Sequence, residues 1–226
     1  MATSSLDREA VKQMLLFMAD RMIAAEPVLS EADRHLGDGD HGLGMARGFS
    51  AVKSRLGSES PESIAKLFGA AGMAMLNTMG GASGALFGTM FRSGGKALEG
   101  RSDFDSGALA DFLEAALAAV MVRGGAKPGE KTMIDALQPA ALKARELAGF
   151  SLPEAASAAA AAAQSGQEAT KAMMAIVGRA KALGAASVGY PDPGAMSVTA
   201  ILEAVRDYVR ASQYGPLAPL RFRRKL

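Results

Sequence analysis

The chain of 226 residues contains no cysteine and no tryptophan. The missing cysteine excludes disulfides, zinc–thiolate sites and cysteine nucleophiles. Aromatic residues make up only 5% of the sequence and no alternating Val/Ile/Thr run appears, so strands are not expected. No apolar run is long enough to span a bilayer, and a net charge of +2 gives no case for nucleic-acid or membrane binding. The N-terminus lacks a basic segment followed by an apolar run, which predicts no signal peptide and a cytoplasmic location.

The residues that are present favour helices almost throughout. Apolar residues, 49% of the total, recur at helical spacing from Val11 to Ile23, and residues 4–7 fit a capping box at the start of this first helix. Ser60 and Pro61 suit the first positions of another helix, and Pro153 suits the start of a long, alanine-rich one. Further helices are expected at residues 42–56, 61–79, 106–123, 133–148, 153–183 and 196–212, and from after Gly81 to near Gly100.

These segments predict an all-α fold, an up-down bundle or barrel of about eight antiparallel helices joined by short loops. A chain of this length can bury a sizeable core, and no linker divides it, so residues 1–214 are expected to form a single domain. Residues 215–226 change in character, because proline and arginine become frequent there. They are expected to form a basic, flexible tail.

The most informative segment is GDGDHG at residues 37–42, with Asp33 shortly before it. Three carboxylates this close repel one another, and a hard divalent cation such as Mg²⁺ would relieve that repulsion. The glycines leave room for a phosphate or a tight turn. The segment therefore predicts a metal–nucleotide site, against the simpler interpretation of an acidic surface turn.

Three familiar motifs fit these letters less well. GxGxxG at residues 37–42 follows no apolar strand, and its aspartates would repel a bare pyrophosphate. A calcium-binding EF-hand loop from Asp38 would need ligands where Gly42 and Phe49 stand. Gly95 and Lys96 resemble the end of a P-loop, but the following Ala97 replaces its hydroxyl residue. A carboxylate cluster that binds phosphate through metal remains.

Three other loops are rich in glycine. Residues 80–84 (GGASG) stand at a helix start, where free N–H groups and the Ser83 hydroxyl can bind an anion. Residues 124–133 and 189–194 form the other two loops. In an up-down bundle, loops at the same end can converge on one pocket. Arg179, expected late on the helix at 153–183, could reach a phosphate there.

These motifs, taken in order, resemble the nucleotide-binding L subunit, or L domain, of dihydroxyacetone kinases. The resemblance extends over GDGDHG and MARGF after it, GGASG, GEKTMIDAL at residues 129–137, GRA at 178–180 and DPGA at 192–195. It implies a barrel of eight antiparallel helices with ADP or ATP bound at one end through two Mg²⁺ ions. The implied metal ligands are Asp33, Asp38 and Asp40. The implied nucleotide-binding residues are His41, Gly42, Leu43, Gly44, Ala82, Ser83, Gly124, Met133, Arg179, Asp192, Pro193 and Gly194.

The chain departs from that family at Leu43 and Gly44, where many relatives carry Thr or Ser and then Asn. A side-chain hydroxyl near the phosphates is therefore missing. The backbone N–H groups of both residues could still donate to an anion from a helix start.

The resemblance implies half of an enzyme. In that family a separate K subunit or domain holds a short ketose covalently on a histidine, and the only histidines here, His35 and His41, flank the acidic loop. The donor would be ATP, or bound ADP recharged by a phosphoenolpyruvate-fed phosphotransfer protein, an M-type subunit. A homodimer is a further assembly open to the chain. The alternatives are a regulatory module that signals its nucleotide state to a partner such as a transcription factor, and a helical scaffold without ligand.

Overall fold

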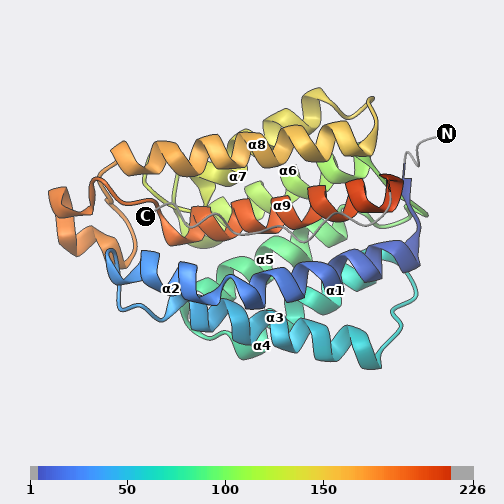
Figure 1. The fold of residues 1–226 in the computed structure, drawn as a ribbon, viewed down its shortest axis with the longest axis horizontal. Helices are drawn as coiled ribbons and strands as arrows, with labels where there is room; N and C mark the ends of the chain where they lie inside the picture. Colours follow the sequence, from blue (N-terminus) through green and yellow to red (C-terminus); the bar gives the residue numbers. More distant parts are fainter. Residues whose placement is uncertain (1–4, 215–226) are drawn as a thin grey trace.

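In a computed structural model, residues 5–214 are described and form an almost entirely helical structure (Figure 1). The α-helices are α1 (Arg8–Ala24), α2 (Glu26–Arg34), α3 (His41–Ser58), α4 (Ile64–Thr78), α5 (Gly81–Lys96), α6 (Ser106–Gly124), α7 (Ile134–Glu146), α8 (Leu152–Ala169) and α9 (Pro193–Tyr214). Two short 3₁₀ segments, η1 (Thr170–Ala172) and η2 (Arg179–Ser187), lie between α8 and α9. Two-residue strands β1 (Ser5–Leu6) and β2 (Phe104–Asp105) pair antiparallel.

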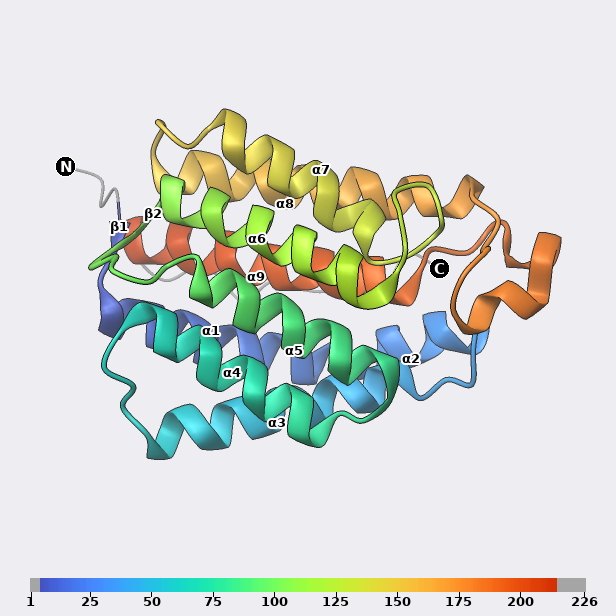
Figure 2. The same cartoon turned by 180° about the vertical axis from the view of Figure 1, so that it is seen from behind.

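Eight of these helices close a ring. From α3 to α9, each helix packs against the next along the chain, and α1 packs against both α3 and α9 (Figures 1 and 2). Helix α2 follows α1 directly and packs against the start of α3 at one end of the ring. The prediction of an all-α barrel of about eight antiparallel helices is confirmed.

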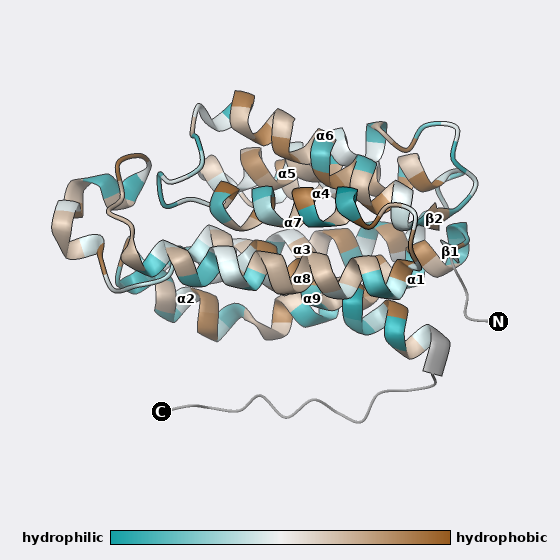
Figure 3. Ribbon diagram, turned by 90° about the horizontal axis from the view of Figure 1, so that it is seen from above, coloured by the Kyte–Doolittle hydropathy of each residue, from teal (hydrophilic) through white to brown (hydrophobic). Residues whose placement is uncertain are grey.

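The interior of the ring is filled with apolar side chains. Phe68 is central: its ring centroid lies 4.7 Å from that of Phe112, 5.8 Å from that of Phe104 and 6.3 Å from that of Phe91. The void among these side chains is only about 10 Å³, at the lower limit of the roughly 10–15 Å³ that a cavity needs to hold one water. Along the helices, hydrophobic and hydrophilic residues alternate in bands, as expected for amphipathic helices packed on one core (Figure 3).

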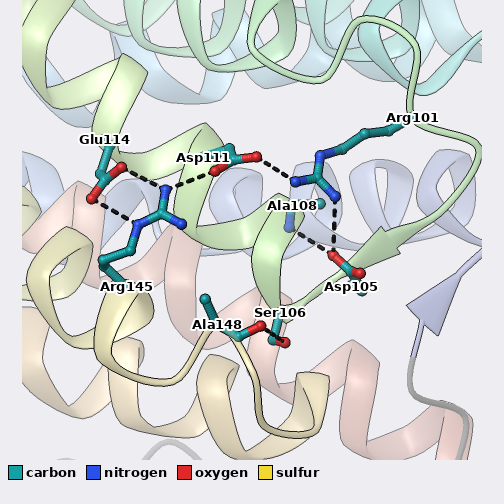
Figure 4. A network of polar contacts seen from close by, with 8 residues as sticks. All are labelled: Arg101, Asp105, Ser106, Ala108, Asp111, Glu114, Arg145 and Ala148. Carbon is teal, nitrogen blue, oxygen red and sulfur yellow. Dashed lines mark hydrogen bonds and ion pairs between the residues drawn. The ribbon is translucent and has the colours of Figure 1, made fainter.

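Near the start of α6 and the end of α7, ion pairs fix the ring (Figure 4). Arg145 on α7 lies 2.7 Å from Asp111 and 2.6 Å from Glu114, both on α6. The Ser106 hydroxyl donates to the carbonyl oxygen of Ala148 at 2.8 Å. These contacts join α6 to α7 at the end of the ring away from the acidic loop.

The expected helix at 153–183 is wrong in its second half. Helix α8 ends at Ala169 and passes into the 3₁₀ turn η1, in which the Met173 N–H donates to the carbonyl oxygen of Thr170 at 3.1 Å. The same oxygen also accepts a hydrogen bond from the Lys131 ammonium group. Further on, Gly178 and Gly184 have φ angles of 67° and 51°, which are incompatible with a right-handed helix.

Other boundaries also differ from the sequence prediction. Helix α4 begins at Ile64 rather than at residue 61, because the Ser63 side chain caps it by accepting from the Lys66 N–H at 3.2 Å. Helix α1 is capped by Asp7, while the Ser4 of the expected capping box and the expected basic tail at 215–226 lie outside the described residues. Helix α2 was not expected. Among residues 5–214, none of the helices has the length and apolar character needed to cross a membrane.

Candidate metal and nucleotide site

Four helices begin at the same end of the ring. Because neighbouring helices run antiparallel, α3, α5, α7 and α9 all start at this end (Figure 2). A cavity of about 480 Å³ is lined by residues from the starts of all four. Each helix start leaves N–H groups without intrahelical partners and carries a partial positive charge. The cavity is therefore suited to an anionic ligand such as a phosphate.

The acidic loop lies at the edge of this cavity. Asp33 is in the last turn of α2, and Asp38 and Asp40 are in the link to α3. One carboxylate oxygen from each of the three lies within 4.8 Å of the others. Asp33 also accepts a hydrogen bond from the His41 N–H at 3.1 Å, which fixes it against the start of α3. Oxygen ligands at this spacing are those that Mg²⁺ prefers.

Arg179 faces these carboxylates. Arg179 Nη1 pairs with Asp38 and lies 3.4 Å from an oxygen of Asp40. Desolvation raises the pKa of the Asp38 carboxyl, but hydrogen bonding with Asp40 and the charge of Arg179 outweigh it and hold that pKa below its ordinary value. One cation against three carboxylates leaves an excess of negative charge that a divalent ion can neutralise. The expectation that Arg179 lies late on a long helix is wrong, because this residue is at the start of η2.

His41 is buried between two hydroxyl groups. Its Nε2 lies 2.8 Å from Ser197 Oγ, and its Nδ1 lies 3.3 Å from Ser83 Oγ. The Ser197 hydroxyl itself donates to the Pro193 carbonyl oxygen at 3.1 Å, so it accepts from Nε2–H. Burial lowers the pKa of His41, although Asp33 and Asp40 act in the opposite direction. His41 therefore joins the starts of α3, α5 and α9 as a neutral ring.

The glycines of the site have different tasks. Gly80 and Gly81 adopt left-handed φ angles of 72° and 59°, and the resulting turn brings the free N–H groups of α5 to the cavity wall. Gly42 instead faces α2, where a Cβ atom would lie 2.3 Å from the Glu26 carbonyl oxygen. Gly42 is thus needed for close packing of α3 on α2.

The structure brings most of the expected residues together. Those that line the cavity are Asp33, Asp40, His41, Gly44, Ala82, Ser83, Met133, Arg179, Asp192, Pro193 and Gly194. Asp38 reaches the site through the carboxylate cluster. Gly42, Leu43 and Gly124 do not line the cavity, and the Leu43 side chain is 59% exposed. The Leu43 side chain therefore contributes nothing to the cavity wall.

Sequence reasoning assigned no role to several polar residues of the site, among them Lys131 and Ser197. Lys131 lies inside the GEKTMIDAL segment at residues 129–137, whose letters do not indicate that this lysine lines the cavity. Ser197 lies one turn into α9 and meets a histidine 156 positions earlier in the chain. Nothing in the local sequence indicates the contact between Ser197 and His41.

Ser83 provides a first test of this geometry. Its hydroxyl lines the cavity at the start of α5, so Ser83→Ala should weaken Mg–ADP binding. Loss of a hydrogen bond to a charged group costs roughly 1.5–3 kcal/mol, or about ten- to a hundredfold in affinity. Titration calorimetry measures this, with Ser93→Ala near the other end of α5 as the matched control. If the variant binds Mg–ADP as tightly as wild type, the Ser83 hydroxyl does not contact the phosphates, and only metal and backbone groups hold them.

The ring of antiparallel helices and the cavity at its end define a class, the helical barrels with a site for an anionic ligand at one end. A family model, the DAK2 domain, matches residues 35–207. The ADP-binding subunit DhaL of the PEP-dependent dihydroxyacetone kinase of Escherichia coli (strain K12) is 36% identical over 201 residues, which make up 88% of this chain and 96% of that protein. The chain belongs to the DAK2 domain family, which confirms the resemblance seen in its motifs.

Longer relatives contain the same unit. L-erythrulose kinase of Pectobacterium atrosepticum is 37% identical over 208 residues, which cover 90% of this chain and 35% of that enzyme. The crystal structure of the dihydroxyacetone kinase from C. freundii in complex with AMP-PNP and Mg²⁺ matches with a TM-score of 0.69 and 28% identity, over 87% of this chain and 33% of that one. This chain thus spans about a third of these two kinases.

Proposed function

We propose that this chain is the nucleotide-binding, phosphoryl-transferring subunit of a kinase for dihydroxyacetone or a related short ketose. Residues 1–214 act as one nucleotide-binding domain, and a separate K-type subunit holds the ketose. The donor is Mg-bound ATP, or bound ADP recharged by a phosphoenolpyruvate-fed M-type subunit. The match to an E. coli relative named as an ADP-binding subunit, which covers 96% of that protein, supports this role. The proposed compartment is the cytoplasm.

One observation carries the proposal: the carboxylate cluster lies at the edge of a cavity lined by four helix starts. Asp33, Asp38 and Asp40 would hold two Mg²⁺ ions, whose charge, when bound, neutralises the phosphates. The N–H groups at Ala82 and Ser83 would bind the phosphate oxygens. Phosphoryl transfer needs such positioning and charge neutralisation more than covalent chemistry from the protein.

The rest of the cavity suits the less polar part of a nucleotide. Met133, Pro193 and Gly194 line it beyond the acidic loop. Asp192 accepts from the Ala195 N–H at 2.7 Å, so it caps the start of α9. Burial raises the pKa of Asp192 to about 7, which reduces the negative charge close to a bound anion. Because these four residues line the cavity and Asp192 carries a reduced negative charge, we assign Met133, Asp192, Pro193 and Gly194 to the nucleotide pocket.

Calorimetry of ADP binding to the full chain tests the proposal. With Mg²⁺ present we expect binding, and with EDTA we expect none, because bare phosphates and three carboxylates repel one another. Mass analysis of the natively purified protein would add whether ADP is retained. Equal affinity with and without EDTA would contradict a metal-bridged site, and no binding in either condition would contradict the nucleotide site itself.

A further inference from the structure

Between α8 and α9 the chain leaves the ring and extends beyond its end (Figure 1, orange). We call residues 170–190 the excursion. It is bonded internally: the Gly189 N–H donates to the Lys171 carbonyl oxygen at 2.7 Å, and the Ala175 N–H donates to Ser187 Oγ at 2.9 Å. The first of these bonds keeps the two ends of the excursion side by side. The excursion is therefore a unit whose two ends, near Thr170 and Tyr190, form a base through which it is attached to the ring.

Lys131 binds both ends of that base. Its Nζ donates to the carbonyl oxygens of Thr170 and Tyr190, each at 2.5 Å. Its side chain is only 2% exposed, which is rare for a lysine. Burial lowers the pKa of Lys131, while the charges of Asp192 and Asp135 act against this. A single buried ammonium group thus joins the excursion to the loop before α7.

The backbone around Lys131 is arranged for this contact. Lys131 has a φ angle of 61° and is the sole non-glycine residue with positive φ in the part of the chain that the structure describes. Such a conformation is unfavourable for a residue with a Cβ atom and persists only where the surroundings enforce it. Asp135 does so by accepting from the N–H groups of Gly129 at 2.5 Å and Thr132 at 2.7 Å. Backbone strain that the surrounding residues enforce is typical of functional positions, and Lys131 is such a position.

The excursion carries Arg179 to the acidic loop, where it pairs with Asp38. Other contacts to the ring add to the base: the Asp192 N–H donates to Thr170 Oγ1 at 2.9 Å, and the rings of His35 and Tyr190 stack at 4.3 Å. From this arrangement we propose that Lys131 is a positioning residue, which holds the excursion against the ring so that Arg179 faces the carboxylates and the bound phosphates. The part that concerns phosphates rests on the proposed function.

Hydrogen exchange of the nucleotide-free protein tests the clamp by itself. Lys131→Met removes the donors and keeps the length of the side chain, so exchange within residues 171–190 should rise by about tenfold or more while α1 and α4 stay unchanged. Lys127→Met is the matched control, an exposed lysine on the same loop, and should leave exchange as in wild type. If Lys131→Met does not fold, Lys131→Gln takes its place. Unchanged exchange in the excursion would overturn the proposal.

A double-mutant cycle on Mg–ADP affinity tests whether Lys131 acts through Arg179. Arg179→Ala should weaken binding by about tenfold or more, and Lys131→Met should weaken it to a lesser extent. In the Arg179→Ala background, Lys131→Met should cost nothing further. Losses that add in the double variant would overturn the proposal and indicate direct contact between Lys131 and the nucleotide. Absence of Mg–ADP binding in wild type would contradict the proposed function, and the exchange experiment would still decide the clamp.

Discussion

Replacing Asp38 or Asp40 by alanine should weaken Mg–ADP binding by about a hundredfold or more. Each replacement removes one carboxylate from a cluster whose oxygens lie within 4.8 Å of one another. Two remaining carboxylates hold a hard cation less well, and the cation is needed to bring phosphates to this edge of the cavity. A hundredfold loss corresponds to about 2.7 kcal/mol. A loss of this size is expected when one carboxylate is removed from a divalent ion that itself contacts the phosphates.

The same variants should fold normally. The side chains of Asp38 and Asp40 are 54% and 65% exposed, and their ion pairs with Arg179 are therefore surface pairs, worth about 0–1 kcal/mol. Circular dichroism and thermal unfolding should stay close to wild type. Asp103→Ala, an exposed aspartate next to β2 at the other end of the ring, is the matched control. Binding of Mg–ADP to Asp40→Ala as tightly as to wild type would show that the acidic loop is only a surface turn.

The helices of the ring could be predicted from the sequence, because their apolar residues recur at helical spacing and glycine or proline marks most of their ends. Helix α2 escaped prediction. It follows α1 after a single residue, Ala25, and carries Pro27 in its first turn. Because α2 has only nine residues and no longer break precedes it, local signals did not separate it from the first helix.

The excursion shows where local reasoning fails. The alanine-rich run favours helix up to and beyond Ala169, yet the chain turns away at η1, where the Thr170 carbonyl oxygen accepts from both the Met173 N–H and the Lys131 ammonium group. The contact with Lys131 joins residues 39 positions apart, and no periodicity encodes it. The same holds for Ser197, whose hydroxyl meets His41 only once α3 and α9 have come together.

The acidic loop could be predicted because its residues, unlike those of the excursion, are close together in the sequence. Its three carboxylates lie within eight residues, so their mutual repulsion is evident before any fold is known. Antiparallel packing then implied that loops at the same end converge, and the cavity does join residues from four such loops. What the local pattern could not show was the counter-charge, because Arg179 reaches Asp38 from 141 positions away.

The purified chain should not phosphorylate dihydroxyacetone or a similar short ketose from ATP, and a cognate K-type subunit should raise activity from background to full turnover. A histidine that holds a ketose covalently must reach the sugar. His41 is buried between Ser83 and Ser197, and His35, although exposed, stacks on Tyr190 and does not line the cavity. We therefore expect the acceptor to be brought by another protein.

A coupled assay of ketose phosphate formation measures this in four mixtures, with and without the K-type subunit and with either ATP or phosphoenolpyruvate plus the phosphotransfer proteins. Turnover with ATP indicates an exchangeable nucleotide, and turnover only with phosphoenolpyruvate indicates bound ADP that is recharged in place. Asp40→Ala should abolish activity in every mixture, whereas Asp103→Ala should behave as wild type. Robust turnover by the chain alone would contradict the half-enzyme interpretation. A stable complex with the K-type subunit that forms no ketose phosphate from either donor would instead favour a regulatory module, since the nucleotide site would then report its state without transferring phosphate.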